Sequence, residues 1–230
     1  MRRFSEAMAW PRQGGFAIDA ALDERLAFIR RTYATLLIQL IGVALSTSLM
    51  IKTGLAEKLW PGGLLIGFLG LIFIVPRLIV PTASRGLQVG GASLVVAFYG
   101  LMLSPLVKYA PPGVLMQAGI LTGCVFAGLT AYVFITKKDF NFLGGMLYGV
   151  AFALIGVGVI FFFLGGLGNT GGMIYSGVAV LLFSGFVLYD TSNIMKRYPT
   201  NAHIAASIAL LIDVVNLFYF IAILLMGNRN

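Results

Sequence analysis

The sequence is poor in charged residues and in the side chains that most often bind metals or form disulfides. Of its 230 residues only 10% are charged, with eight acids and a single histidine, whereas about 25% of the residues of a soluble globular domain are charged. This composition excludes an ordinary soluble domain. The single cysteine, Cys124, excludes a disulfide within one chain and a metal site built from several cysteines. Because it lies inside an apolar run, we expect Cys124 to be a small core residue.

The apolar residues, which make up 59% of the chain, form long continuous runs. A membrane-spanning helix needs about 20 apolar residues, and these runs lack the strict alternation of a membrane β-barrel. The sequence therefore predicts an all-α membrane protein, a seven-transmembrane-helix bundle. The expected spans cover residues 32–51, 63–80, 87–107, 114–135, 142–164, 173–194 and 203–226.

The domain organisation and the topology follow from these spans. Residues 1–31 form a polar, basic N-terminal tail that lacks the apolar core of a signal peptide, so we expect no cleaved leader. Residues 32–226 form the membrane domain, and residues 227–230 form a short C-terminal tail. Most of the 16 lysines and arginines fall on the side of the N-terminal tail, and the other side carries only Lys52, Lys58, Lys108 and Arg229. The positive-inside rule therefore predicts a cytoplasmic N-terminus, and the net charge of +8 does not indicate a nucleic-acid partner.

Two acids interrupt the last two apolar runs. An aspartate at the centre of a membrane helix costs about 2.5 to 3.5 kcal/mol on insertion, and such residues usually serve a function. Asp190 lies six residues before Lys196, about 9 Å from the cytoplasmic end of its span. Asp213 lies ten residues after His203, about 15 Å from the same side. Neighbouring antiparallel helices would therefore bring the two carboxyl groups to similar depths.

Two carboxyl groups at similar depth can share a proton. In contact at low dielectric they do not both ionise easily, so the pair retains one proton. We therefore predict that Asp190 and Asp213 form a pH-sensing pair. Asn193 and Asn216 are the polar side chains that we expect to support it. Arg77, at the cytoplasmic end of the second span, is a candidate latch that pairs with ionised Asp190 and is released when Asp190 is protonated.

Simpler interpretations exist for parts of this pattern. Asp190 alone is close enough to the cytoplasm to be an interfacial acid that reaches water, and Arg77 alone fits an ordinary positive-inside residue. The segment 166–171 matches the G-x-G-x-x-G of dinucleotide-binding folds. It joins two apolar runs and follows no strand, so we interpret it as a turn outside the cytoplasm and expect no cofactor.

Glycine is abundant, with 29 residues. Small residues four positions apart let helix backbones approach closely in a membrane. Four glycine pairs have this spacing and indicate a packed bundle, namely Gly63 with Gly67, Gly86 with Gly90, Gly119 with Gly123, and Gly145 with Gly149.

Three segments resemble a known family. They read FAGLTAYVFITKKDFNFLGG (126–145), LYDTSNIM (188–195) and LLIDVVNLFYFIAILL (210–225). In these segments the chain is similar to the Bax inhibitor-1 family, also called the transmembrane Bax inhibitor motif family, and the resemblance extends from about residue 63 to the end. It implies a seven-helix bundle with the last helix central, acting as a pH-sensitive calcium leak channel. It also implies that Asp190 and Asp213 are the pH-sensing pair and that Arg77 is the latch.

These expectations define the partners and leave two alternatives open. We expect a bacterial inner-membrane protein that contacts the lipid bilayer and is not an enzyme. Calcium is the expected permeant ion, and because it prefers six to eight oxygen ligands, Asp190 and Asp213 would bind it only weakly and transiently. One alternative is a non-conducting regulator that binds a membrane protease or another membrane protein. The other is an intramembrane aspartyl protease, although the G-x-G-D of those enzymes is replaced here by Leu-Leu-Ile-Asp.

Overall fold

The computed structural model describes residues 16–59, 67, 70, 74–166 and 168–227. In these ranges the regular secondary structure is α-helical apart from one short 3-10 helix, and the only extended pairing is an isolated bridge between Phe16 and Pro199. The chain divides into two compact units. The first unit contains Met1–Ser104 and Ile194–Ala209, and the second contains Pro105–Asn193 and Leu210–Asn230.

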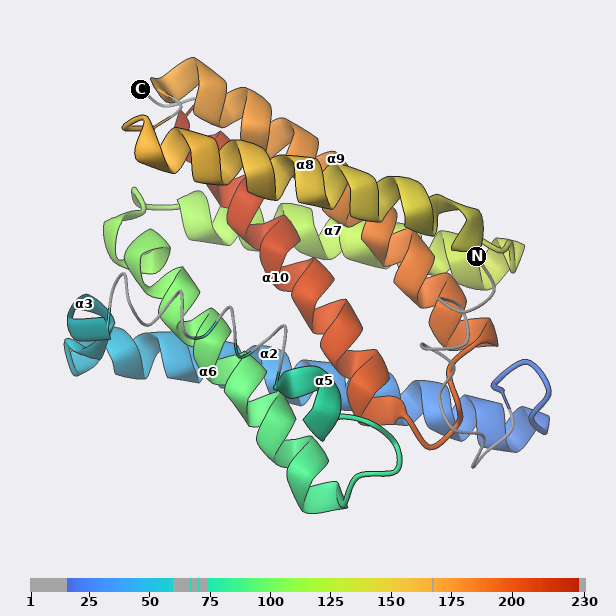
Figure 1. Ribbon diagram of the computed structural model, residues 1–230. Coiled ribbons are helices and arrows are strands. Elements are labelled where there is room, and N and C mark those ends of the chain that lie inside the picture. The colour runs from blue at the N-terminus through green and yellow to red at the C-terminus, as the bar shows by residue number, and fades with distance from the viewer. Residues whose placement is uncertain (1–15, 60–66, 68–69, 71–73, 167, 228–230) are drawn as a thin grey trace. The chain divides into compact units, whose positions relative to one another are not determined.

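The first unit is built around two long helices (Figure 1). These are α2 (Leu22–Lys52) and the first part of α6 (Arg85–Tyr109), and the short helices α3 (Leu55–Leu59) and α5 (Val75–Leu78) lie between them in the sequence. α2 begins well before the expected span at residue 32, so the end of the predicted N-terminal tail is helical. The start of the described chain is fixed to the segment after α9, because the Ala17 N–H donates to the Tyr198 carbonyl at 2.9 Å and Thr200 hydrogen bonds Glu24.

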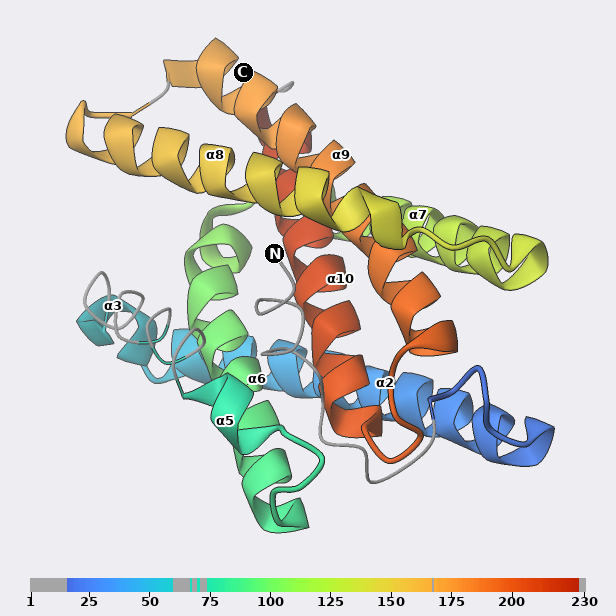
Figure 2. The same ribbon diagram turned by 45° about the vertical axis from the view of Figure 1, so that its right-hand side comes forward.

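α2 and α6 run in the same direction and make two close contacts. A Cβ added at Gly42 would lie 3.1 Å from Val96 Cγ1, and one added at Gly100 would lie 2.6 Å from Ser46 Cβ. Each pair is separated by the same 54 positions in the sequence, which fixes the register between the two helices. Away from these contacts the two helices diverge toward their N-terminal ends, as Figures 1 and 2 both show.

The second unit packs α8 (Gly144–Phe163) against α9 (Gly168–Lys196). Leu147 of α8 and Leu182 and Phe186 of α9 form a buried apolar cluster, and the Tyr175 hydroxyl donates to the Leu154 carbonyl at 3.2 Å. The opposite side of α8 is open to the surroundings, because Phe152 is 73% exposed and Phe163 is 80% exposed. α7 (Val114–Thr136), the 3-10 helix Asn141–Leu143 and the second part of α10 (His203–Gly227) complete this unit.

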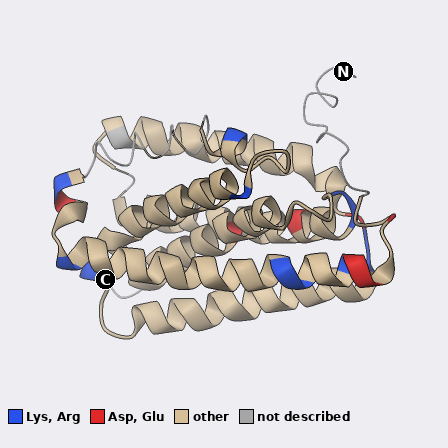
Figure 3. Cartoon of the chain, turned by 90° about the horizontal axis from the view of Figure 1, so that it is seen from below, with Lys and Arg blue, Asp and Glu red and all other residues tan. Residues whose placement is uncertain are grey.

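Six helices in the described ranges are long and apolar enough to cross a membrane. They are α2, α6, α7, the segment Asn141–Phe161, α9 and α10. Lys, Arg, Asp and Glu colour little of their length in Figure 3, as expected for helices that face lipid. These helices confirm an all-α membrane protein. Half of the expected span over residues 63–80 lies outside the described residues, which there include Gly67, Gly70 and the seven residues from Ile74 on.

Two details differ from the sequence predictions. The Cys124 side chain is exposed on α7 instead of buried in a core, because an apolar position on a membrane-spanning helix can face lipid as well as a neighbouring helix. Several glycines of the predicted close-approach pairs, such as Gly90 and Gly123, have no atom within 4 Å of an added Cβ. Spacing alone marks a helix face that can pack closely, and the tertiary fold decides which of these faces has a neighbour.

Candidate functional site

Asp190 and Asp213 come from consecutive helices, and both belong to the second unit. Asp190 lies near the end of α9, which stops at Lys196, and Asp213 lies ten residues into α10, which begins at His203. A short connection joins the two helices, so α10 returns alongside α9. The structure therefore brings the two acids together.

The two carboxyl groups lie close enough to each other to form a hydrogen bond. Asp213 is only 2% exposed, and its Oδ2 has no hydrogen-bond partner among the described residues. Asp190 is partly exposed. An ionised carboxylate can only accept hydrogen bonds, so a bond between two carboxyl groups requires at least one proton on the pair. The geometry thus fits a single proton held between Asp190 and Asp213.

Two further polar side chains surround the pair. The Asn193 side chain hydrogen bonds Asp190 from the next turn of α9. The Tyr148 hydroxyl, on α8, is close enough to both carboxyl groups to interact with them electrostatically. The Tyr148 ring packs edge-on against Tyr189 and Phe186, with centroid distances of 6.2 Å and 5.4 Å.

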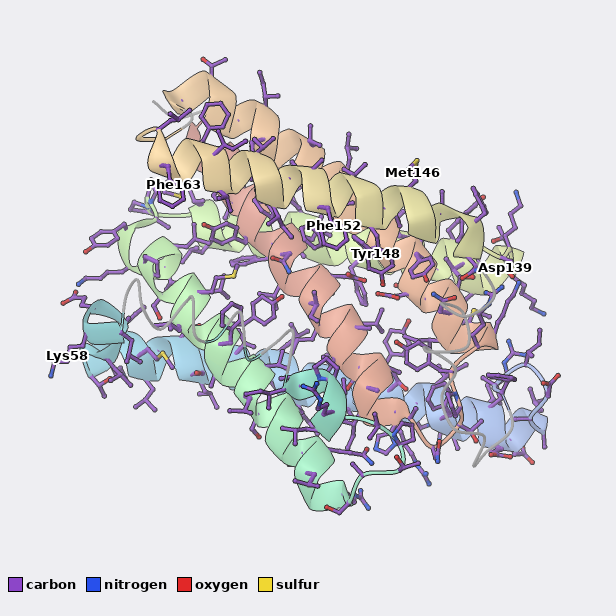
Figure 4. All side chains as sticks on the ribbon, viewed as in Figure 1. Lys58, Asp139, Met146, Tyr148, Phe152 and Phe163 are labelled. Carbon is purple, nitrogen blue, oxygen red and sulfur yellow. The ribbon has the colours of Figure 1, made fainter. Side chains whose placement is uncertain are left out.

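Tyr148 is the neighbour that sequence analysis did not identify. It is half exposed, at 51%, and Figure 4 labels it on α8 together with Met146 and Phe152. An isolated tyrosine in an apolar run is usually a packing or interface residue. Nothing in the sequence indicated that α8 would place this hydroxyl near acids more than forty residues away.

Asn216 takes part in local helix bonding. Its Nδ2 donates to the Ile212 carbonyl of the same helix at 2.8 Å.

Ser192 fixes the end of α9 that carries Asp190, because its Oγ accepts a hydrogen bond from the Phe140 N–H at 3.1 Å and donates to the Lys138 carbonyl at 3.4 Å. The loop between α7 and α8 is therefore tied to the turn beside the acid pair.

Arg77 lies in the last turn of α5, in the first unit, whereas Asp190 lies in the second. Its role as a latch therefore stays a prediction.

Among the described residues there is no group of three or more His, Cys, Asp or Glu side chains that could hold a metal ion. Two carboxyl groups alone are too few ligands for a tight calcium site.

Comparison with known proteins identifies the family. The model of a family described as "Inhibitor of apoptosis-promoting Bax1" matches residues 25–230. The chain belongs to the Bax inhibitor-1 family. The family match confirms the resemblance found in the sequence and extends it to nearly the whole chain, including α2.

Relatives in the Bax inhibitor-1 family come from fungi, viruses and bacteria. The chain is 32% identical to Bax inhibitor 1 of Schizosaccharomyces pombe over 204 residues, which cover 87% of this chain and 76% of the relative. It is 28% identical to the Golgi anti-apoptotic protein of Vaccinia virus, with 94% and 92% covered. An uncharacterized membrane protein of Vibrio cholerae is 34% identical, with 70% and 71% covered.

Proposed function

We propose that this protein is a pH-sensitive calcium leak channel, and that the proton shared by Asp190 and Asp213 controls its opening. The observation that carries this proposal is that the two carboxyl groups lie within hydrogen-bonding reach of each other on two apolar helices of the second unit, with Asp213 almost fully buried. The gain or loss of one proton changes the charge of this pair. At low dielectric such a change strongly alters the free energy of the contact between α9 and α10.

The protonation state of the pair sets how α9 and α10 hold together. With one proton present, the carboxyl groups bridge the two helices. Without it, two neighbouring carboxylates repel each other, and with two protons the charge that attracts a cation is lost. Ionised carboxylates also give calcium a weak, transient site, which suits a permeant ion better than a stored one. In this proposal the segment 63–80 supplies a seventh span, and the last helix is central to the bundle.

The proposal is tested by calcium influx into liposomes that contain the purified protein and a trapped calcium dye. We expect influx above that of empty liposomes, and we expect its rate to depend on pH across the physiological range. Liposomes with the protein that take up no more calcium than empty ones at every pH would contradict the channel function.

The Arg77→Gln variant tests the latch. If Arg77 pairs with ionised Asp190 in the closed state, its removal favours the open state at the higher pH values, where Asp190 is ionised most often. A latch that contributes about 1 kcal/mol would raise the calcium influx there about fivefold. Arg77→Gln and Asp190→Asn should then be non-additive. If the effects of the two variants on calcium influx simply add in the double variant, Arg77 does not act through Asp190.

A non-conducting regulator is the second candidate, and the surface of α7 supports it. Gly119 and Gly123 lie four residues apart, and a Cβ added at either would meet no atom within 4 Å. Such a face can accept a helix of another membrane protein. The names of the Vaccinia virus and Schizosaccharomyces pombe relatives describe anti-apoptotic or inhibitor proteins. If no calcium flux is found, co-purification of the wild type and a Gly123→Leu variant from membranes tests this function.

A further inference from the structure

The first unit contains an apolar groove of about 370 Å³ between α2 and α6. It extends from Ser46 and Ala97, past the close contact at Gly42, toward the N-terminal ends of the two helices, and Ile204 of α10 forms part of its wall. Ile38, Val89 and Val96 supply much of the apolar lining. All of the residues that line the groove belong to the first unit.

One buried polar side chain in this groove has no partner. Gln39 is only 5% exposed, and neither its Nε2 nor its Oε1 has a hydrogen-bond partner among the described residues. The register of α2 and α6 places Ser93 opposite Gln39, but the Ser93 hydroxyl donates to the Val89 carbonyl of its own helix at 3.0 Å. Buried polar groups in native proteins are almost always hydrogen bonded. The Gln39 carboxamide can therefore bond to a molecule that enters the groove.

Two arginines lie one helical turn beyond residues that line the groove. Arg31 precedes Thr35 on α2, Arg85 precedes Val89 on α6, and both act electrostatically on His203, at the start of α10. Both arginine side chains are exposed. Arg31 precedes Gln39 by eight residues, which is about 12 Å along the helix. Positive charge thus lies at the mouth, and an unpaired carboxamide lies deeper inside.

The described part of the segment between α3 and α6 does not cover this groove. Leu78 and Ile79 contact α6 at Gly91, and Gly67 contacts it at Phe98. Gly91 and Phe98 are seven residues apart and share one face of α6. Val89, Ser93 and Val96, which line the groove, lie on the opposite face. Among the described residues, this segment therefore leaves the groove free for a molecule from outside the chain.

We propose that this groove binds an anionic glycerophospholipid from the bilayer. An acyl chain would occupy the apolar lining, an ester carbonyl would accept a hydrogen bond from Gln39 Nε2, and a water could donate to Oε1. The phosphate would lie between Arg31 and Arg85, whose long side chains can follow the groove. Basic pockets between membrane helices are known to bind anionic lipid head groups. The site lies entirely in the first unit and does not depend on the function of Asp190 and Asp213.

The test measures lipid binding to the full-length protein after lipid has been removed in an uncharged detergent. Phosphatidylglycerol and phosphatidylcholine with identical acyl chains are added separately. Thermal unfolding reports the stabilisation by bound lipid, and native mass spectrometry reports how many lipids remain bound. We expect one retained lipid and a larger rise in Tm with phosphatidylglycerol than with phosphatidylcholine.

Two variants distinguish the contribution of the head group to lipid binding from that of the ester contact. Arg31→Gln with Arg85→Gln should weaken phosphatidylglycerol binding about tenfold or more and abolish the preference over phosphatidylcholine. Gln39→Leu should keep the Tm of the lipid-free protein but weaken the binding of both lipids about fivefold, because both carry the ester. The matched control is Lys137→Gln with Lys138→Gln, which removes two positive charges at the end of α7 and should leave lipid binding unchanged.

Several outcomes would overturn the proposal. Equal binding of the two lipids by the wild type would exclude a phosphate site, as would an unchanged preference in the double arginine variant. Inorganic phosphate that raises the Tm as much as phosphatidylglycerol would indicate a free anion in place of a lipid. A dimer without bound lipid in the mass spectra would assign the groove to a second copy of the chain.

Discussion

Calcium flux through the Asp213→Asn variant is expected to lose most of its dependence on pH. The asparagine Nδ2 can still donate a hydrogen bond to Asp190, so the contact between α9 and α10 is kept. What is lost is the second carboxyl group, and with it the proton that the two groups share. Asp190→Asn should have the same effect, and the double variant should add little to either single one, because the titration belongs to the pair.

The control for this prediction is Asp139→Asn. Asp139 is an exposed acid in the loop between α7 and α8, and its Oδ1 accepts a hydrogen bond from the Asn141 N–H at 3.0 Å, which an asparagine oxygen can replace. Figure 4 labels it at the end of the second unit. This variant should keep the pH profile of the wild type. A wild-type profile in Asp213→Asn as well would contradict the role of the pair.

Gly100→Ala is expected to cause the largest loss of stability. The added Cβ would lie 2.6 Å from Ser46 Cβ and 3.1 Å from the Ser46 backbone carbonyl carbon. A rotation of the serine side chain cannot relieve the contact with the backbone, so α2 and α6 must move apart. Overpacking of this kind costs about 1 to 3 kcal/mol, which corresponds to a fall in Tm of roughly 2 to 12 °C for a chain of this size.

Gly90→Ala on the same helix provides the comparison. A Cβ at Gly90 meets no atom within 4 Å, and alanine favours a helix over glycine by up to about 1 kcal/mol. Thermal unfolding in detergent should therefore show Gly90→Ala equal to or above the wild type and Gly100→Ala well below it. If both variants unfold at the same temperature, the close approach of α2 and α6 is not a feature of the folded protein.

The last two spans and the acid pair could be predicted from the sequence with good precision. The expected span 203–226 matches α10, and α9 extends the expected span 173–194 by only a few residues at each end. Long apolar runs leave the chain few other places to put a helix. Asp190 and Asp213 were identifiable because a charge inside such a run is costly and therefore rare.

Other features of the structure depend on how the helices pack against one another, and no periodic pattern in the sequence predicts this packing. The position of Tyr148 beside the acids depends on how α8 packs on α9. The groove with Gln39 depends on the register between α2 and α6, two helices more than thirty residues apart in the chain. The expected first span began only at residue 32 because the first turns of α2 are polar and contain Asp23 and Glu24, which favour a helix N-terminus but interrupt an apolar run.

The most direct test of the account is an infrared titration of the protein in liposomes, recorded beside the calcium flux of the same sample. The carbonyl band of a protonated carboxyl group reports the shared proton itself. We predict one such band in the wild type that changes over the same pH range as the flux and is missing in both Asp190→Asn and Asp213→Asn. A flux that changes with pH while this band stays constant would contradict gating by a proton shared between the two aspartates.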